Sequence, residues 1–208
     1  MNSMPMIVES DPQQMQSVFA AQQATAIRWR ESLAEQRLAR LKRLREAVLA
    51  HRQAFYQAFE QDYRKPSAEV DVTELMPILD EIRHAIGRLK QWMKPQKVSP
   101  TSLMLTTSAW IEYQPRGRVL IIAPWNYPLN LCFGPLVSAL AAGNTAIIKP
   151  SEMMPNVSAV MAKIIREVFS PNEVALFEGG LPTAEALLAL PFDHIFFTGS
   201  PMVGKVVM

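Results

Sequence analysis

The sequence predicts an α/β fold with a doubly wound parallel sheet, preceded by helices and by a short antiparallel arm. Four short apolar runs indicate the sheet, and segments of helical character lie between them. The apolar runs are VLIIA at 119–123, TAIIK at 145–149, VALFE at 174–178 and HIFFT at 194–198. The helical segments span residues 128–142, 155–169 and 183–190. Strands and helices that alternate at this spacing require right-handed crossovers, which give a parallel sheet covered on both faces.

The composition argues against several kinds of site and partner. The 208 residues are 49% hydrophobic and 19% charged, and the net charge of +2 gives no strong field for nucleic acid or membranes. The single cysteine, Cys132, excludes an internal disulfide and a thiolate metal cluster, and it fits a reducing compartment. There is no signal-peptide pattern and no apolar run of about 18 residues. We therefore expect a cytoplasmic protein without a metal, a nucleic-acid partner or a membrane span.

Residues 12–94 have the pattern of helices. Apolar residues recur there at helical spacing, with Arg, Lys, Glu and Gln between them. In the first helix they are Leu41, Leu44, Val48, Phe55 and Phe59, and in the second they include Val70, Leu75, Ile78, Ile82, Ile86 and Leu89. A break near Lys65-Pro66-Ser67 separates the two helices, and the second ends near Lys94-Pro95. We expect both to serve packing.

The segment TSLMLTTSAWIEYQ, at residues 101–114, has a different character. It has no helical period and is rich in Thr, Ile, Trp and Tyr, and the sequence PRG follows it. This composition favours an antiparallel strand pair or arm.

Three motifs each follow a predicted strand, and ligands of such sheets bind beyond the carboxyl ends of the strands. The first motif is IIAPWNYPLN at residues 121–130, in which Asn126 lies between two aromatic residues and two prolines. An amide in such a stiff turn can direct its NH₂ group at a fixed position, and a preorganised donor to a developing oxyanion is a large catalytic factor. Alternatively, Asn126 satisfies its own turn, as asparagine often does.

The second motif is IIKPSE at residues 147–152, where a strand ends at Lys149 and Glu152 follows after a proline. A cation and a carboxylate at a strand end suit ribose hydroxyls, because the ammonium donates hydrogen bonds and the carboxylate accepts them. The alternative is a surface ion pair or a helix cap, since Ser151 and Glu152 can cap the helix that follows.

The third motif is FTGSPMVGK at residues 197–205. A strand leads into Gly199, and Gly204 follows in the opening of a helix. Glycine lets the backbone approach a phosphate closely, and free N–H groups at a helix start favour an anion. The spacing differs from the usual three-glycine dinucleotide fingerprint, so a plain strand-to-helix turn is the alternative.

Together, and in this order, the three motifs resemble the aldehyde dehydrogenase superfamily. The resemblance is carried by APWNYPLN, AAGNTAIIKPSE and FDHIFFTGSPMVGK, and the segments LMPILDEI and WMKPQKV fit as well. The sequences WNYP and FDHIFFTGS are most similar to those of the class 3 branch and of coniferyl-aldehyde dehydrogenases. They favour the aldehyde-oxidising branch over the acyl-CoA reductases. The resemblance runs from about residue 15 to the last residue.

The resemblance implies three regions in this chain. Residues 1–100 are N-terminal helices of the cofactor-binding domain, residues 101–115 are the β arm of the oligomerisation region, and residues 116–208 are an incomplete Rossmann-like NAD(P)-binding core. The resemblance also implies that the catalytic domain is absent from these residues, so we expect a truncated fold that is similar to less than half of a full-length dehydrogenase. The full-length form is expected to be a homodimer.

The resemblance also implies roles for individual residues. Asn126 matches the family's donor to the oxyanion of the thiohemiacetal that forms when a cysteine attacks an aldehyde. Lys149 and Glu152 match the contacts to the adenosine ribose, and Ser151 lies beside them. The Glu152 carboxylate favours NAD because it would repel a 2′-phosphate, and the class 3 branch often accepts NADP as well.

The remaining site residues follow from the same resemblance. The stretch from Gly199 to Gly204, with Ser200, matches the part of the family that lies against the cofactor pyrophosphate. Trp125 is expected to shape the wall of the same pocket. Tyr127 is expected to line the path of the substrate, a medium-chain or aromatic aldehyde.

By this resemblance, two groups that the family's chemistry needs are expected downstream of residue 208: a cysteine nucleophile and a glutamate general base in an ELGG-type motif. Cys132 lies in NLCFGPLV, inside a predicted helix, and is expected to be a buried packing residue. We therefore expect the chain alone to be inactive. The alternative is a natural non-catalytic module that binds a nucleotide or a partner, because its motifs would be the same.

Overall fold

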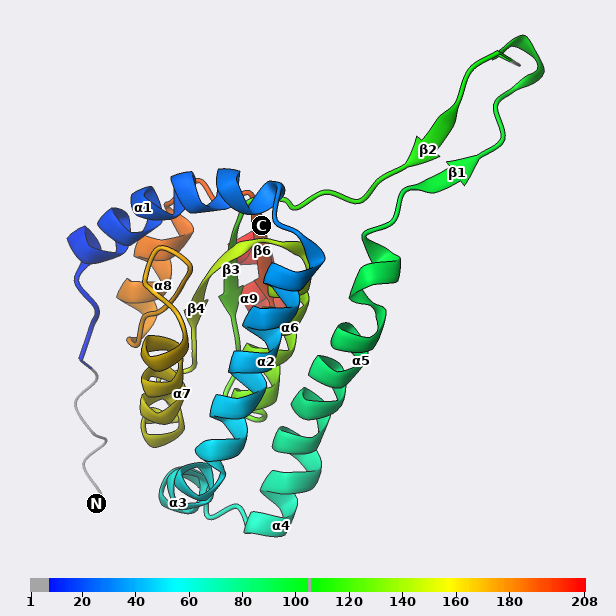
Figure 1. Cartoon of the computed structure of the whole chain (residues 1–208). Helices are drawn as coiled ribbons and strands as arrows, with labels where there is room; N and C mark the ends of the chain where they lie inside the picture. Colours follow the sequence, from blue (N-terminus) through cyan, green and yellow to red (C-terminus); the bar gives the residue numbers. More distant parts are fainter. Residues whose placement is uncertain (1–7, 105) are drawn as a thin grey trace.

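A four-stranded parallel sheet lies at the centre of the molecule, in a computed structural model that describes residues 8–104 and 106–208 (Figure 1). The strands are β3 (Arg118–Ile122), β4 (Thr145–Lys149), β5 (Val174–Leu176) and β6 (His194–Phe197), in the order β5-β4-β3-β6. The chain builds outward from β3 through β4 to β5 and then returns to place β6 on the other side of β3. This order confirms the predicted doubly wound α/β fold, with its switch point between β3 and β6.

Helices cover both faces of the sheet. On one face are α6 (Pro128–Ala142) and α7 (Pro155–Val168), and on the other are α1 (Pro12–Arg30) and α8 (Leu181–Leu188). The side chains of β3 alternate between the two cores, with Val119 and Ile121 in the first and Leu120 and Ile122 in the second. A strand buried on both faces must be apolar at successive positions, which explains the continuous apolar runs in the sequence.

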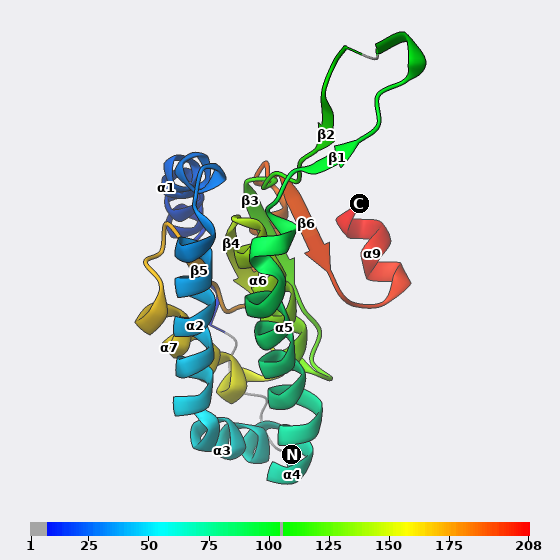
Figure 2. The same cartoon turned by 45° about the vertical axis from the view of Figure 1, so that its right-hand side comes forward.

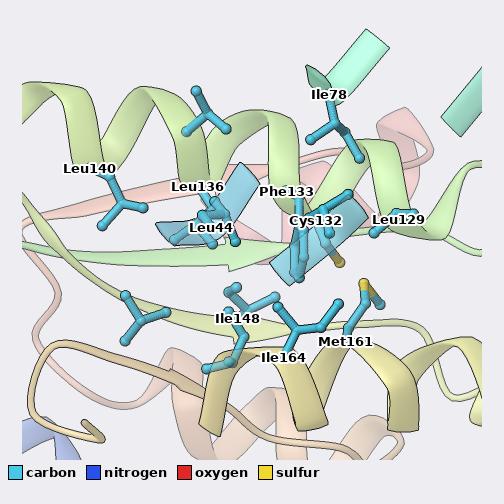
Figure 3. Packing of buried hydrophobic residues seen from close by; sticks show 14 of the residues in the cluster. Leu44, Ile78, Leu129, Cys132, Phe133, Leu136, Leu140, Ile148, Met161 and Ile164 are labelled. Atoms are coloured by element: carbon cyan, nitrogen blue, oxygen red, sulfur yellow. The ribbon is translucent and has the colours of Figure 1, made fainter. Parts of the chain in front are cut away.

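The other N-terminal helices form an outer layer over α6 and α7 (Figure 2). They are α2 (Ala34–Ala50), α3 (Arg52–Tyr63), α4 (Ser67–Val70), the π-helical turn η1 (Asp71–Leu75) and α5 (Met76–Trp92). The sequence predicts one helix through residues 41–59, whereas the structure divides it at His51. Only this one residue separates α2 from α3, so the apolar spacing continues across the break and conceals it. Figure 3 shows side chains from these layers and from β4 meeting in the larger core.

The arm is an antiparallel pair of strands, β1 (Gln96–Val98) and β2 (Ala109–Ile111), which extends away from the body of the molecule (Figure 1). The short helix η2 (Ser102–Met104) lies between them. The sequence predicts such a pair within residues 101–115, whereas the first strand already begins at Gln96. The reason is that α5 ends at Trp92, ahead of Pro95, and a residue that precedes proline favours extended over helical geometry.

Both ends of α6 are held by buried charged side chains from the N-terminal helices. At the N-terminus, Oε2 of Glu74 accepts a hydrogen bond of 2.9 Å from the Asn130 N–H. At the C-terminus, Nη1 of Arg37 donates to the carbonyl oxygens of Ala141 and Ala142, at 3.2 and 2.8 Å. A carboxylate at the first end and a cation at the second both match the helix dipole. The N-terminal helices therefore fix α6, and with it the turn that precedes α6.

Two kinds of feature are absent from residues 8–104 and 106–208. No helix there combines the length and the apolar character that a membrane crossing needs. No group of three or more His, Cys, Asp or Glu side chains there is arranged to hold a metal ion.

Candidate nucleotide and oxyanion site

The three motifs meet at one edge of the sheet, because they follow the neighbouring strands β4, β3 and β6. The strands also end level with one another. Ile122, the last residue of β3, pairs with Lys149 on one side and with Phe197 on the other. Parallel strands place their carboxyl ends together, and this is the edge at which doubly wound sheets bind ligands.

Asn126 lies in an exposed turn between β3 and α6, where aromatic contacts hold its neighbours. The Trp125 ring meets the Tyr63 ring edge to face, with 5.8 Å between centroids. The Tyr127 ring lies 4.7 Å from the Lys65 ammonium. Within the described part of the chain, the Asn126 side chain makes no hydrogen bond to its own turn. The oxyanion contact predicted for this amide stays a prediction.

Lys149 and Glu152 form an ion pair at the end of β4. Nζ of Lys149 lies 2.9 Å from Oε2 of Glu152, with side chains that are 6% and 35% exposed. Burial alone would raise the pKa of Glu152, but hydrogen bonds from its own N–H and from Lys149 outweigh burial and lower the pKa below its ordinary value. The carboxylate is therefore ionised at neutral pH and lies beside a cation.

The alternative of a helix cap at this motif is not realised. The side chain that caps α7 is Asp62 of α3, whose carboxylate accepts from the N–H groups of Asn156, at 3.2 Å, and Val157, at 2.9 Å. The Ser151 hydroxyl instead accepts a hydrogen bond of 3.3 Å from the Met153 N–H. Asp62 provides the cap, whereas the alternative of an ion pair is realised by Lys149 and Glu152, and the predicted ribose contact stays a prediction.

A cavity of about 770 Å³ opens beside this motif. Its lining includes Ser151 and Glu152, the α7 residues Ser158 and Arg166, the residues Glu178 and Gly179 after β5, and Val8 to Ser10. This volume lies within the roughly 300–1,000 Å³ of small-molecule sites. Asn126, Trp125, Tyr127 and the third motif do not line this cavity. The structure thus joins the second motif to a cavity and leaves the first and third motifs along the same sheet edge, outside it.

Two of the three residues predicted in the third motif, Gly199 and Ser200, have a structural role in the fold. Ser200 caps α9 (Pro201–Val207), because its hydroxyl accepts a hydrogen bond of 3.3 Å from the Val203 N–H. A Cβ at Gly199 would overlap the Phe197 ring, which would have to move, so glycine there has a packing reason. A Cβ at Gly204 would lie 3.5 Å from the same ring, which is an ordinary contact. Only Gly204 lacks a packing reason, and the predicted phosphate contact stays a prediction.

Sequence reasoning missed Glu9, which binds the loop at the wall of the cavity. Its carboxylate accepts hydrogen bonds from the Gly180 N–H, at 3.1 Å, and from the N–H and hydroxyl of Thr183, at 3.2 and 2.5 Å. The Thr183 hydroxyl is the main reason that the pKa of Glu9 is lowered. The contact joins residues more than 170 positions apart, as do those of its neighbour Ser10 with Thr183. No local pattern signals such a contact.

Cys132 is fully buried in α6, as predicted, and burial raises the pKa of its thiol above the ordinary value. We expect iodoacetamide to leave Cys132 unmodified in the folded chain and to alkylate it in urea, because the thiolate is the reactive form. Mass spectrometry of protein treated in both conditions measures this difference. Rapid alkylation of the folded chain would contradict the packing role.

The whole described fold is similar to that of known enzymes. The model of the aldehyde dehydrogenase family matches residues 4–208. A probable coniferyl aldehyde dehydrogenase of Pseudomonas aeruginosa is 40% identical over 94% of this chain. Aldehyde dehydrogenase family 3 member B1 of Bos taurus is 43% identical over 84% of it. The predicted resemblance to the class 3 and coniferyl-aldehyde branch is therefore confirmed.

A solved structure agrees with these sequence relatives. The substrate-bound state of Staphylococcus aureus AldH has a TM-score of 0.90 and 39% identity over 93% of this chain. The chain spans 42% of the length of that protein, and 41% and 37% of the two relatives above. It thus corresponds to well under half of the curated relatives that it matches. The chain belongs to the aldehyde dehydrogenase family.

Proposed function

We propose that this chain supplies the nucleotide-binding part and the oxyanion donor of an NAD(P)-dependent aldehyde dehydrogenase, which oxidises an aldehyde to a carboxylic acid. One observation carries the proposal: Glu152, which is paired with Lys149, lines a cavity of about 770 Å³ at the sheet edge that also bears Asn126. Membership of the family supports the reaction class.

The second motif suits the ribose of a dinucleotide. The Lys149 ammonium donates to a ribose hydroxyl and the Glu152 carboxylate accepts from one, which is a donor set that fits the group chemically. The Glu152 charge disfavours a 2′-phosphate, so NAD is the preferred form and NADP the weaker one. When bound, the nicotinamide accepts the hydride that leaves the aldehyde carbon. Ser151 lines the same cavity, and we assign Trp125, Gly199, Ser200 and Gly204 to the remainder of the cofactor site.

Asn126 suits the oxyanion that forms when a thiolate attacks an aldehyde carbonyl. Its exposed amide, at the end of β3, donates a hydrogen bond to the oxygen as negative charge develops there. Tyr127, next in the chain and 41% exposed, lines the path of a medium-chain or aromatic aldehyde. Cys132 is buried and cannot serve as the nucleophile, so we propose that the nucleophile and the general base lie outside these 208 residues. The complete enzyme is proposed to be a cytoplasmic homodimer.

Isothermal titration of NAD into the 208-residue chain tests the nucleotide site. We expect saturable binding, and we expect Lys149→Ala to weaken it at least about tenfold, because a hydrogen bond to a charged group contributes roughly 1.5–3 kcal/mol. NADP should bind more weakly than NAD. The chain should not produce NADH from NAD and an aldehyde.

The matched control is Lys163→Ala. Lys163 lies on α7 and forms an exposed ion pair with Glu167 at 3.9 Å, outside the cavity. Its loss removes the same charge and should leave the affinity for NAD unchanged. Equal affinities of the Lys149 and Lys163 variants would refute the ribose site. Dehydrogenase turnover by this chain alone would refute the proposed location of the nucleophile.

A further inference from the structure

We propose that the buried ion pair Lys65–Glu74 is the positioning element of the Asn126 turn, an inference that rests on the proposed role of Asn126 as oxyanion donor. Nζ of Lys65 lies 2.9 Å from Oε1 of Glu74, and the two side chains are 1% and 0% exposed. Removing both charges from water is costly, so such a pair contributes little net stability compared with apolar residues. Because the pair adds little net stability, we infer its role from the groups that it contacts.

The Lys65 end of the pair contacts the residue that follows Asn126. The Lys65 ammonium lies 4.7 Å from the centre of the Tyr127 ring and 5.3 Å from that of the Phe59 ring. A desolvated ammonium over an aromatic face is attracted to it, by as much as about 2 kcal/mol in favourable sites. This contact fixes one side of the Asn126 turn.

The Glu74 end contacts the helix that begins directly after the turn. Oε2 of Glu74 accepts a hydrogen bond of 2.9 Å from the Asn130 N–H, in the first turn of α6. The Asn130 side chain in turn donates to the Thr73 carbonyl oxygen, at 3.4 Å. One carboxylate thus joins Lys65 to the start of α6. Burial raises the pKa of Glu74, although the hydrogen bonds from Lys65 and Asn130 act in the opposite direction.

The residue before Asn126 is held by the same segment of chain. Trp125 packs edge to face against Tyr63, two positions before Lys65, with 67° between the ring planes. Asn126 therefore lies between two aromatic residues that are both anchored to residues 63–74. An amide held on both sides has a defined direction, which is what a preorganised oxyanion donor needs.

Two unusual backbone conformations flank the ion pair. Arg64, with φ 52° and ψ 32°, is the one non-glycine residue with positive φ among residues 8–104 and 106–208. Glu74 lies in the π-helical turn η1. Both conformations are uncommon, and π-helical turns occur frequently at functional sites. They lie next to Lys65 and around Glu74, so an uncommon backbone conformation accompanies each member of the ion pair.

Fluorine NMR of the chain labelled with 5-fluorotryptophan tests the proposal without nucleotide or turnover. The four tryptophans give four resonances, and loss of one in Trp125→Phe assigns Trp125. In Lys65→Met/Glu74→Gln, which removes both charges and keeps an acceptor for Asn130, we expect the Trp125 resonance to move, because the ring, already 42% exposed, would lose its fixed contact with Tyr63. The other three resonances should stay. The single variant Lys65→Arg keeps a cation over Tyr127, so its Trp125 resonance should stay at the native position.

The control is Arg52→Met/Asp71→Asn. This ion pair joins α3 to η1, whereas Lys65–Glu74 joins the loop after α3 to η1. The side chains of the control pair are 54% and 23% exposed, and its removal should leave the Trp125 resonance in place. An unmoved Trp125 in Lys65→Met/Glu74→Gln, or an equal movement in the control, overturns the proposal. If the first double variant does not fold, Tyr127→Leu removes the exposed partner of the same contact. An unmoved Trp125 in that variant is likewise a refutation. A failed NAD titration would refute the nucleotide site and leave this result intact.

Discussion

Replacing Phe133 by alanine is expected to lower the free energy of unfolding by about 3–5 kcal/mol, because the change deletes a large buried ring and leaves a cavity. Phe133 is fully buried on α6, in the core shared with α2, β4 and α7 (Figure 3). Small domains have total stabilities of about 5–15 kcal/mol, so the loss is a large fraction of the whole. Urea unfolding followed by circular dichroism measures it as a lower midpoint with an unchanged slope.

Ser138→Ala is the matched control for this prediction. Ser138 lies on the same helix but is exposed, so its replacement should change stability by no more than about 0.5 kcal/mol. Because both variants place alanine in α6, the difference between them reports burial rather than helix propensity. Similar midpoints for the two variants would mean that Phe133 does not occupy the core.

The sheet and its helices could be predicted because their signals are local. β3 and β4 are buried on both faces, and each gives an unbroken apolar run that the sequence displays directly. The start of α6 at Pro128 and its end before Gly143 carry the usual residue signals for helix ends. The break at His51 escaped because it does not disturb the apolar spacing. The early start of the arm at Gln96 escaped because a three-residue strand has too few positions to show alternation.

The candidate site could be predicted in part. The pairing of Lys149 with Glu152 followed from their spacing, and the position of Asn126 followed from the end of the strand. The role of Asp62 as the cap of α7 could not be predicted, because that contact joins residues more than 90 positions apart. The same holds for Glu9, which reaches the cavity wall from the start of the chain.

Glu74 differs from Asp62 and Glu9, because its position among the neighbouring apolar residues indicates that it is buried. It lies four residues after Val70 and four before Ile78, so it occupies a position on the buried face of the second predicted helix. A charge on an apolar face requires a buried partner. Lys65, beside the proline that breaks the helices, is a near candidate in sequence. The apolar spacing by itself indicates only that this face packs against other elements. A reading of the apolar residues alone therefore overlooks the buried glutamate among them.

Gly143→Ala is expected to destabilise the chain by about 2–4 kcal/mol, and it tests the anchor at the C-terminus of α6. Gly143 has a φ of 88°, in the left-handed region, where a side chain costs roughly 1–2 kcal/mol. Its new Cβ would also lie 2.7 Å from Cζ of Arg37, which is too close. The guanidinium would have to move and would lose its hydrogen bonds to Ala141 and Ala142. Thermal and urea unfolding of the variant measure the loss.

Gly87→Ala is the control, and its expected effect has the opposite sign. Gly87 lies exposed within α5, its φ is not positive, and a Cβ added there would meet no atom within 4 Å. Alanine there should stabilise the chain by about 0.5–1 kcal/mol, because it restricts the unfolded state and favours the helix. The two variants make the same chemical change, so a difference in sign reports the local backbone and the neighbour alone.

The outcome at Gly143 bears on how the site is built. Asn126 precedes α6, and α6 is fixed at one end by Glu74 and at the other by Arg37. If the loss in Gly143→Ala exceeds the roughly 1–2 kcal/mol expected from the left-handed backbone alone, the buried guanidinium holds the helix end, and the N-terminal helices are part of the scaffold that orients Asn126. If Gly143→Ala is neutral, Arg37 can move without cost. The position of α6 would then depend on the apolar core and on the contacts at its N-terminus, which include the hydrogen bonds of Asn130 with Glu74 and with the Thr73 carbonyl oxygen.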